Sequence, residues 1–545
     1  MPKQILDYQL SGFLSTLFIH KKQSWKQYTL FYIILDRSMK LFKTDNALES
    51  LNTKLFWLLL IIFSGIVAVG VGITLLTIYY GKPVGDDFLA IHDFGISLWL
   101  QNTVHYLINT ARYGQSIAGS ILYGIFQNRV GVFLPLMVIF WLGSLFFMYI
   151  SKIEKALALN IAILPRILIS STFIFIAIFV NKTVDPGGTW FAYQDFFFSS
   201  AIVTYTLPLL LLLTLAYVYV FIVKRPLSRI SLVYLGMSLY ALGLFNEVQP
   251  ITIIEMSGLL IILGIIQNKG FLFNKLKALR LPLIIAITSS LLALLTMYFS
   301  PANQQRRMAT GGMVAGGKYE AILHTINYTL SSLYFRPSDL VLIISFSIVC
   351  FIAYKIYVKK NSLKSLPVAM GVGVFMLFSF LISLCTTRAL LVYGYGPSVG
   401  VLPRTLLIPQ LLYVTGIFIT SFCCLEFIFS KIKKEYSSFF MLALSLGFII
   451  ALVFLIPKYM HRIDSQIENA VGYSNAWITQ DSILKEKART NPSQTIYLPD
   501  AGAGIGDGFS LRCTGPYVQN TIWLTEGIET YYGVKEVCAE SDLKQ

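Results

Sequence analysis

The sequence contains little charge for its length. Lys, Arg, Asp and Glu make up 13% of its 545 residues, whereas about 25% is usual in soluble globular proteins. Apolar residues make up 56%, and the mean hydropathy is +0.68. The shortage of charge excludes an ordinary soluble protein and favours one that is embedded in a membrane.

Histidines and nucleotide-binding glycine patterns are scarce too. The chain has 5 His, and His92 and His105 have no ligand-like spacing with other acids, so they predict no designed metal site. The segment AGAGIGDG lacks the G-x-G-x-x-G spacing of a dinucleotide site, because Asp507 stands where the third glycine should be. We interpret this segment as a tight loop after a strand.

Only 6 cysteines occur in the chain. Cys513 and Cys538 lie in the C-terminal segment, where an oxidising exterior would allow them to pair; the sequence leaves that pairing open. The other four fall in or near apolar segments and are interpreted as small packing residues: Cys350, Cys385, Cys423 and Cys424.

The apolar residues are concentrated in segments long enough to cross a hydrocarbon core of ~30 Å as helices. We therefore predict an all-α polytopic membrane protein with about 11 transmembrane helices. The predicted spans are 54–80, 131–150, 161–180, 199–223, 230–247, 250–267, 281–299, 339–358, 367–387, 404–429 and 437–457.

Basic residues are concentrated in every second connection between these spans. The positive-inside rule then places the N-terminus in the cytoplasm and the C-terminus outside. The net charge of +16 is explained by this topology and by contacts with anionic membrane lipids, and it does not indicate nucleic acid. The basic connections contain Lys152 and Lys155, Lys224 and Arg225, Lys269 to Arg280, Lys355 to Lys364, and Lys431 to Lys434.

We predict three parts along the chain. Residues 1–53 carry two apolar runs too short to span, and we expect them to lie in the cytoplasmic interface. Residues 54–457 form the transmembrane domain. Residues 458–545 are expected to form a small extracytoplasmic α/β domain, with a helix near 459–489, a strand at TIYL, a helix near 518–531 and a strand at VKEV.

Two adjacent carboxylates, Asp86 and Asp87, follow the first span in the segment GKPVGDDF. Charges at the end of a spanning helix are commonly functional. The pair also fits a helix cap with surface solvation and, more weakly, a site for a divalent metal. We favour a functional role at the membrane surface, where a lipid-linked substrate meets a water-soluble acceptor.

Further motifs follow the acidic pair in a fixed order. A long amphipathic loop contains Arg112 and Tyr113; then come FFSSAIVTYTLPLL, an NE pair ending at Glu247, SPANQQRR after a span, and QNTIWLTEGIETYYGV. This order resembles that of bacterial multi-pass glycosyltransferases with the GT-C fold, near the O-antigen glucosyltransferase-like group. The resemblance covers most of the chain from about residue 54. Ala302 replaces the glycine of the family's SPGN..R segment, whereas Asn303 and Arg306 or Arg307 are retained.

The resemblance implies transfer of a sugar from a polyprenyl-phosphate donor to a glycan, lipid or polymer acceptor outside the membrane. Asp86 or Asp87 would take the proton of the acceptor hydroxyl, and cations in outer loops would stabilise the departing phosphate. The expected donor-phosphate residues are Asn303, Arg306, Arg307, Arg388 and Arg404. The expected sugar- or acceptor-binding residues are Arg112, Tyr113, Trp190, Tyr193, Asp195 and Glu247.

Several of these residues also fit plainer structural roles. Glu247 fits a solvated acid in the short link between two spans. The arginines fit contacts with lipid head groups or snorkelling anchors at span ends, and the aromatics fit an interfacial belt. The residues with such alternatives are Glu247, Arg306, Arg307, Arg404, Trp190 and Tyr193.

Two other classes of function stay open. A transporter or lipid-linked oligosaccharide flippase would show internal repeats and charges near the membrane midplane, whereas we find no clear repeat and expect the charges at span ends. A non-catalytic membrane scaffold or sensor would concentrate its informative residues in 458–545, whereas they cluster between the spans.

Overall fold

The fold is described from a computed structural model. It describes residues 45–80, 112–156, 202–222, 227–266, 271–301, 337–358, 366–395, 407–499 and 528–540, together with the single positions 166, 167, 170, 319 and 323.

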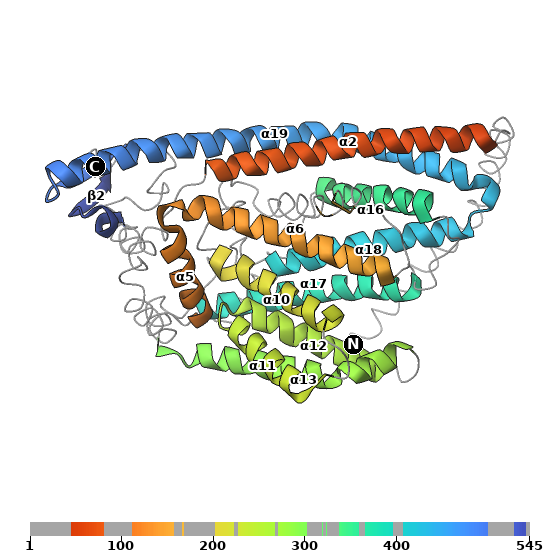
Figure 1. Ribbon diagram of the computed structural model, residues 1–545, viewed down its shortest axis with the longest axis horizontal. Coiled ribbons are helices and arrows are strands. Elements are labelled where there is room, and N and C mark those ends of the chain that lie inside the picture. The colour runs from red at the N-terminus through yellow and green to blue at the C-terminus, as the bar shows by residue number, and fades with distance from the viewer. Residues whose placement is uncertain are drawn as a thin grey trace, which may run out of the picture.

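Helices account for nearly all of the described chain (Figure 1). Two short parallel strands near the C-terminus are the exception. The helices are α2 (Asp45–Tyr79), α5 (Tyr113–Phe126), the 3-10 turn η1 (Gln127–Arg129), α6 (Val130–Ala156), the π-helical turn η4 (Ile202–Thr206), α10 (Leu207–Tyr217), the π-helical turn η5 (Val218–Ile222), α11 (Arg229–Gly243), α12 (Val248–Ile266), α13 (Phe271–Tyr298), α16 (Pro337–Val358), α17 (Leu366–Tyr395), α18 (Leu407–Lys431) and α19 (Lys434–Thr490).

Within the described ranges, seven helical segments are long and apolar enough to cross a membrane. They match seven of the predicted spans, which agrees with the prediction of an all-α membrane protein. Shorter apolar stretches at Trp57–Gly72, Arg229–Gly243 and Leu340–Ile352 fall on three more of them. The predicted span 161–180 lies almost wholly outside the described residues, so the total of about 11 stays a prediction.

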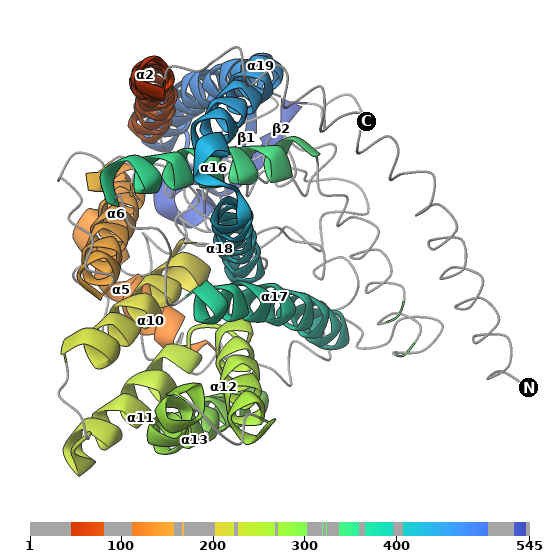
Figure 2. The same cartoon turned by 90° about the vertical axis from the view of Figure 1, so that its right-hand side faces the viewer.

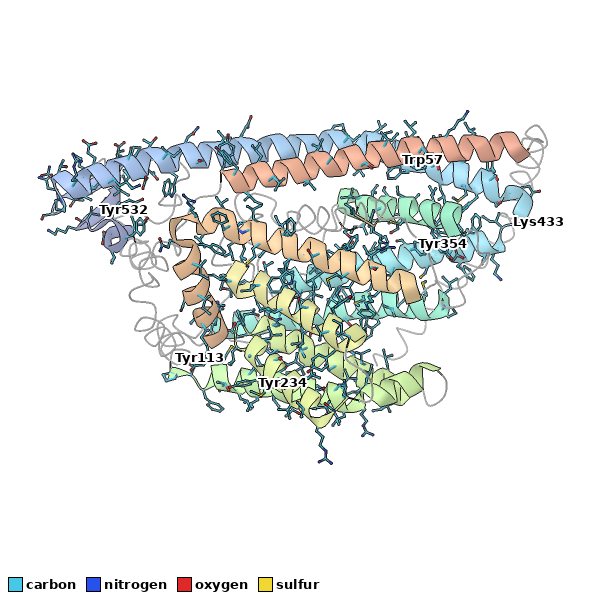
Figure 3. The ribbon with its side chains drawn as sticks, in the orientation of Figure 1. Trp57, Tyr113, Tyr234, Tyr354, Lys433 and Tyr532 are labelled. Carbon is cyan, nitrogen blue, oxygen red and sulfur yellow. The ribbon has the colours of Figure 1, made fainter. Side chains whose placement is uncertain are left out.

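The helices form a bundle with two distinct ends (Figures 1 and 2). Helices α2 and α19 lie side by side along one edge, and α11, α12 and α13 pack together along the opposite edge. Helix α5 lies across the helix ends at one side of the bundle. Figure 3 labels Tyr113, the first residue of α5, and Lys433, the residue before α19, at opposite ends. We call these the α5 end and the Lys433 end.

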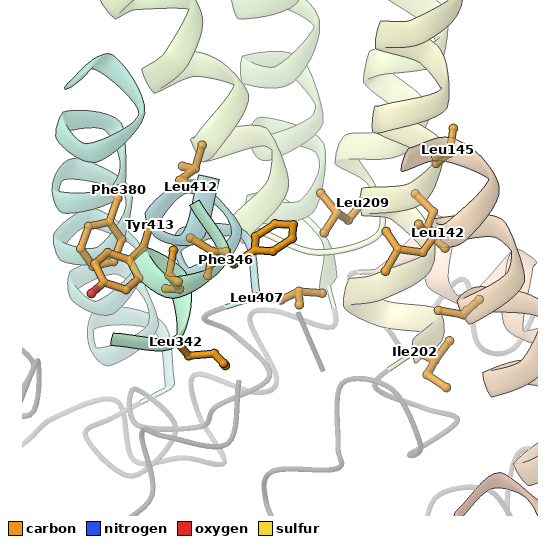
Figure 4. Packing of buried hydrophobic residues seen from close by; sticks show 14 of the residues in the cluster. Leu142, Leu145, Ile202, Leu209, Leu342, Phe346, Phe380, Leu407, Leu412 and Tyr413 are labelled. Carbon is orange, nitrogen blue, oxygen red and sulfur yellow. The ribbon is translucent and has the colours of Figure 1, made fainter. Parts of the chain in front are cut away.

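The largest core cluster joins helices from across the bundle (Figure 4). Phe346 of α16 is 1% exposed and packs against Phe418 of α18, with ring centroids 5.1 Å apart and the rings tilted by 32°. In a lipid environment such contacts stabilise mainly through close packing. Gly416 of α18 provides an example, because a Cβ atom there would lie 3.1 Å from the backbone nitrogen of Leu377 in α17. The absence of a side chain therefore lets these two helices approach closely.

Helix α19 differs from its prediction. We expected a span ending at 457 and a separate helix near 459–489, but α19 is one continuous helix of 57 residues with Pro457 inside it. The interruption expected between these segments is therefore wrong. A proline is tolerated inside a helix where neighbouring groups adjust to the lost hydrogen bond.

The strands that follow α19 form a small parallel pair. Strand β1 (Thr495–Leu498) is the predicted TIYL strand, and it pairs with β2 (Glu536–Ala539), which begins two residues after the start of the predicted VKEV strand. Leu484 of α19 packs beneath the pair in a small hydrophobic cluster. Whether 458–545 forms a separate domain stays a prediction.

The four cysteines of the apolar helices are free, and Cys538, in β2, is disulfide-bonded. The sequence left open whether Cys538 pairs with Cys513, and Cys513 lies outside the described residues.

Candidate functional site

Three segments that are far apart in the sequence meet at the α5 end. Arg112, just before α5, forms an ion pair with Glu247, in the short link between α11 and α12; Nη2 lies 3.3 Å from Oε2. Their side chains are 17% and 18% exposed. The pair is therefore partly shielded yet reachable from the end of the bundle.

A second contact brings in the end of α13. The hydroxyl of Tyr113 donates a hydrogen bond to Oγ of Ser300 at 3.2 Å. Ser300 is 2% exposed and directly precedes the PANQQRR segment. Arg112, Tyr113, Glu247 and Ser300 thus form one polar group, which we call the α5-end cluster.

Close backbone packing holds α5 against the link between α11 and α12. The backbone N–H of Gly114 donates to the carbonyl of Leu244 at 3.0 Å. A Cβ atom on Gly114 would lie 2.5 Å from Cδ2 of Phe245, a distance shorter than van der Waals contact. Glycine is needed here for the close approach of α5 to the link.

Buried amide side chains fix the same link from below. Asn246 donates from Nδ2 to the carbonyl of Thr204 in η4 at 2.6 Å, and its Oδ1 accepts from the backbone N–H of Gln249 at 3.0 Å, as a helix cap does. Gln249 donates from Nε2 to the carbonyl of Pro208 at 2.7 Å. Glu247 is therefore presented by a link that is anchored to η4 and α10.

One acid lies inside the membrane-spanning part of α12. Glu255 falls within the span Val248–Ile265, and its Oε1 accepts a hydrogen bond from the hydroxyl of Thr386 in α17. Thr252 and Ser383, one turn away on the same two helices, are joined through their hydroxyls at 3.3 Å. The expectation that the charges lie at span ends is wrong for Glu255.

A buried ion pair lies near the Lys433 end. Nζ of Lys355 in α16 lies 2.6 Å from Oε2 of Glu426 in α18, and the side chains are 7% and 0% exposed. The Lys355 ammonium also lies 4.5 Å from the ring centroid of Phe429 and 5.3 Å from that of Tyr354. The Glu426 carboxylate and the faces of the two aromatic rings thus together compensate the buried charge of Lys355.

The other predicted site residues are distributed as follows. Arg388 was expected in an outer loop, but its backbone lies inside α17, so that expectation is wrong. The segment RALLVY contains no glycine or proline that would end the helix. The remaining predicted residues lie outside the described residues: Asp86, Asp87, Trp190, Tyr193, Asp195, Asn303, Arg306, Arg307 and Arg404.

Within the described ranges, no group of three or more His, Cys, Asp or Glu side chains is arranged to hold a metal ion. The divalent metal considered for Asp86 and Asp87 is not tested by this, because both residues lie outside those ranges.

No family model, curated protein or solved structure matches this chain. The resemblance to GT-C glycosyltransferases therefore stays a hypothesis that rests on the order of short motifs. The α5-end cluster is an independent observation from the structure, because it joins Arg112 to Glu247 and Tyr113 to Ser300, and the sequence motifs had indicated Arg112, Tyr113 and Glu247 separately.

The buried ionisable groups were not among the predicted site residues. Glu255 stands alone in the apolar run VQPITIIEMSGLLIILGII, and Glu426 is the single acid of the span Leu407–Lys431. A lone ionisable residue inside a span is itself a functional signal. The predicted site residues all came from the ends of spans or the connections between them, so these two acids were missed.

Proposed function

We propose that this protein is a membrane glycosyltransferase that moves a sugar from a polyprenyl-phosphate donor to a cell-surface glycan, lipid or polymer. The observation that supports this proposal is the α5-end cluster. It gathers an arginine, a carboxylate, a phenol and a serine hydroxyl at the end of a membrane bundle, where the head group of a lipid-linked donor and an aqueous acceptor meet.

The chemistry of the cluster suits the recognition of a sugar. A carboxylate accepts hydrogen bonds from sugar hydroxyls, and a guanidinium holds that carboxylate in a fixed orientation. Glu247 and Arg112 are only partly buried, so the ion pair does not seal the carboxylate from a ligand. We assign sugar or acceptor binding to Glu247 and Tyr113, with Arg112 as a positioning residue.

The chain order connects the cluster with the expected catalytic segments. Ser300 is three residues before Asn303 and leads into the segment with Arg306 and Arg307, for which we propose binding of the donor phosphate. Asp86 or Asp87 is proposed as the base. Because removing a well-placed base costs about 100-fold or more in rate, substituting the base among these two residues by Asn should lower the rate of sugar transfer by that factor.

We further propose that the α5 end faces the exterior. Lys355, Lys431 and Lys433 belong to helix ends on the opposite side, as the positive-inside rule requires for a cytoplasmic side. The disulfide at Cys538 also suits an oxidising compartment. Both observations support the predicted orientation of the C-terminus.

Sugar transfer in proteoliposomes containing a polyprenyl-phosphate-linked sugar tests this proposal. Glu247→Gln should lower kcat/KM by about 10- to 100-fold, because a hydrogen bond from a substrate to a charged group contributes about 1.5–3 kcal/mol. Glu468→Gln is the matched control, since Glu468 is exposed on α19. Equal activity of Glu247→Gln and wild type would show that the α5-end cluster has no role in sugar transfer.

A lipid-linked oligosaccharide flippase or transporter is the second candidate. The observation that favours it is Glu255, which lies within the span Val248–Ile265, as the ionisable groups of transporters do. Measuring translocation and transfer of the labelled sugar in the same vesicles separates the two functions. Translocation without transfer would support the flippase and contradict the glycosyltransferase.

A further inference from the structure

Glu255 occupies an unusual position for a carboxyl group. It lies seven residues after Val248, the first residue of α12, and so about 10 Å along the helix axis from that end. Its Oε2 atom is buried and has no hydrogen-bond partner among the described residues. Glu255 also forms no ion pair with any described residue. This separates it from the two other acids described above, Glu247 and Glu426, which both face a basic side chain.

An unpaired carboxylate in this position would be costly. Moving an ionised carboxylate from water into a low-dielectric interior costs several kcal/mol even after relaxation, unless a counter-charge compensates it. The side chain on α17 that is hydrogen-bonded to Glu255 is an uncharged hydroxyl, that of Thr386. Its charge must therefore be neutralised by a bound cation, and a proton is the smallest one.

The hydrogen bonds around Thr386 favour a proton. Its Oγ1 contacts Oε1 of Glu255, and it also lies 2.9 Å from the carbonyl of Ile382 and 3.3 Å from that of Ser383. A hydroxyl has one proton, so it cannot donate to all three acceptors. If Glu255 is protonated, its O–H donates to Thr386, and Thr386 donates to the carbonyl of Ile382, the usual pattern of threonine in a helix.

A metal cation fits this arrangement less well. Hard cations take six or more oxygen ligands, whereas the described contacts of Glu255 supply one hydroxyl. The hydroxyl of Thr252 is already bonded to the carbonyl of Val248 at 2.9 Å. A proton needs only the single acceptor that Thr386 provides.

We infer that Glu255 is a proton-binding site inside the membrane, formed by α12 and α17 and closed by Thr386. The site is independent of the proposed sugar transfer. The thiol of Cys385, next to Thr386 on α17, is one titratable group near Glu255. Other ionisable residues on the elements packed against α12 are Tyr205, Arg229, Tyr234, Tyr240, Lys275, Lys277, Arg280, Tyr298, Arg388, Tyr393 and Tyr395.

Infrared spectroscopy of the full-length protein in lipid nanodiscs tests this inference. A protonated carboxyl group in a dry environment gives a C=O stretching band that is separate from the bands of ionised carboxylates. We expect wild type to show such a band at neutral pH and Glu255→Gln to lose it. Glu247→Gln is the matched control, because Glu247 is paired with Arg112 and should contribute no such band.

Thr386→Val provides a second variant that keeps the acid. Removing the hydroxyl should shift the Glu255 band rather than abolish it, since the carboxyl loses its acceptor. Spectra are compared with and without NaCl after monodispersity is checked. A wild-type spectrum without the band, a band that persists in Glu255→Gln, or a band abolished by Na⁺ would each overturn the proton site.

Discussion

The two ends of the bundle each hold an ion pair, but in different surroundings. At the Lys433 end, Lys355 and Glu426 are almost completely buried, whereas at the α5 end Arg112 and Glu247 each keep nearly a fifth of their side-chain surface exposed. A fully buried pair is inaccessible to ligands and acts on packing alone. A partly exposed pair between separate segments is able to exchange its internal contact for a contact with a ligand. The difference separates a structural pair from a candidate binding pair.

The largest effect is expected from breaking the buried pair. Lys355→Met leaves the Glu426 carboxylate buried without a counter-charge, which should destabilise the protein by about 3–5 kcal/mol. The double variant Lys355→Met/Glu426→Leu should recover most of this loss, because it removes both charges. Thermal unfolding in detergent micelles measures both variants.

A control for that experiment exists in α19. Lys485 pairs with Asp481 at 2.8 Å, but its side chain is 65% exposed. Lys485→Met should therefore change stability by about 0.5 kcal/mol or less. If the double variant at Lys355 and Glu426 were as unstable as the single one, the cost would lie in lost packing and not in the unpaired charge.

The next effect concerns the packing of α5 at the other end. Gly114→Ala forces a methyl group against the ring of Phe245 and should cost about 1–3 kcal/mol. Gly258→Ala is the control, because nothing lies within 4 Å of a Cβ atom there. Combining Gly114→Ala with Phe245→Leu should restore part of the stability if the clash is the cause.

A smaller effect is expected from the partly exposed pair itself. Arg112→Met should cost about 1–2 kcal/mol, the lower part of the range for a hydrogen bond to a charged group, because the pair is partly exposed. Raising the salt concentration should reduce this cost, because exposed charges are screened, whereas the cost of Lys355→Met should hardly change. Unfolding measured at low and high NaCl compares the two ends directly. An equal salt response at both ends would contradict the distinction drawn between them.

The smallest effect lies outside the membrane spans. Burial raises the pKa of Tyr531, the nearby Lys485 opposes this rise, and Asp481 adds to it. Because the folded-state pKa is above the unfolded value, this tyrosine contributes stability that is complete below pH about 10 and is lost as the pH rises further. Tyr531→Phe should flatten the fall in melting temperature above that pH. An unchanged pH profile would assign the fall to other groups.

Much of the helical layout followed from the sequence. The break between α11 and α12 was expected near residue 247 because polar residues interrupt the apolar runs there, and the structure places it at Leu244–Glu247. The expectation that Arg388 lies in a loop was wrong, because the residues between Arg388 and the next glycine favour continuation of the helix.

The candidate site followed from the sequence only in part. Residue type and position selected Arg112, Tyr113 and Glu247 one by one, but 135 positions separate Arg112 from Glu247. Nothing in one sequence specifies that such distant residues pair, because the pairing depends on how the helices pack. The same holds for Glu255 and Thr386, which are 131 positions apart.

The length of helix α19 determines how far strand β1 lies from the start of that helix. Its 57 residues span about 85 Å, nearly three times the ~30 Å of a hydrocarbon core. Each residue added to or removed from it would shift the strands by about 1.5 Å and turn them by about 100°. The length of this helix therefore sets both the height and the facing direction of strand β1, which follows it. A change of about seven residues, close to two whole turns, would nearly keep that direction.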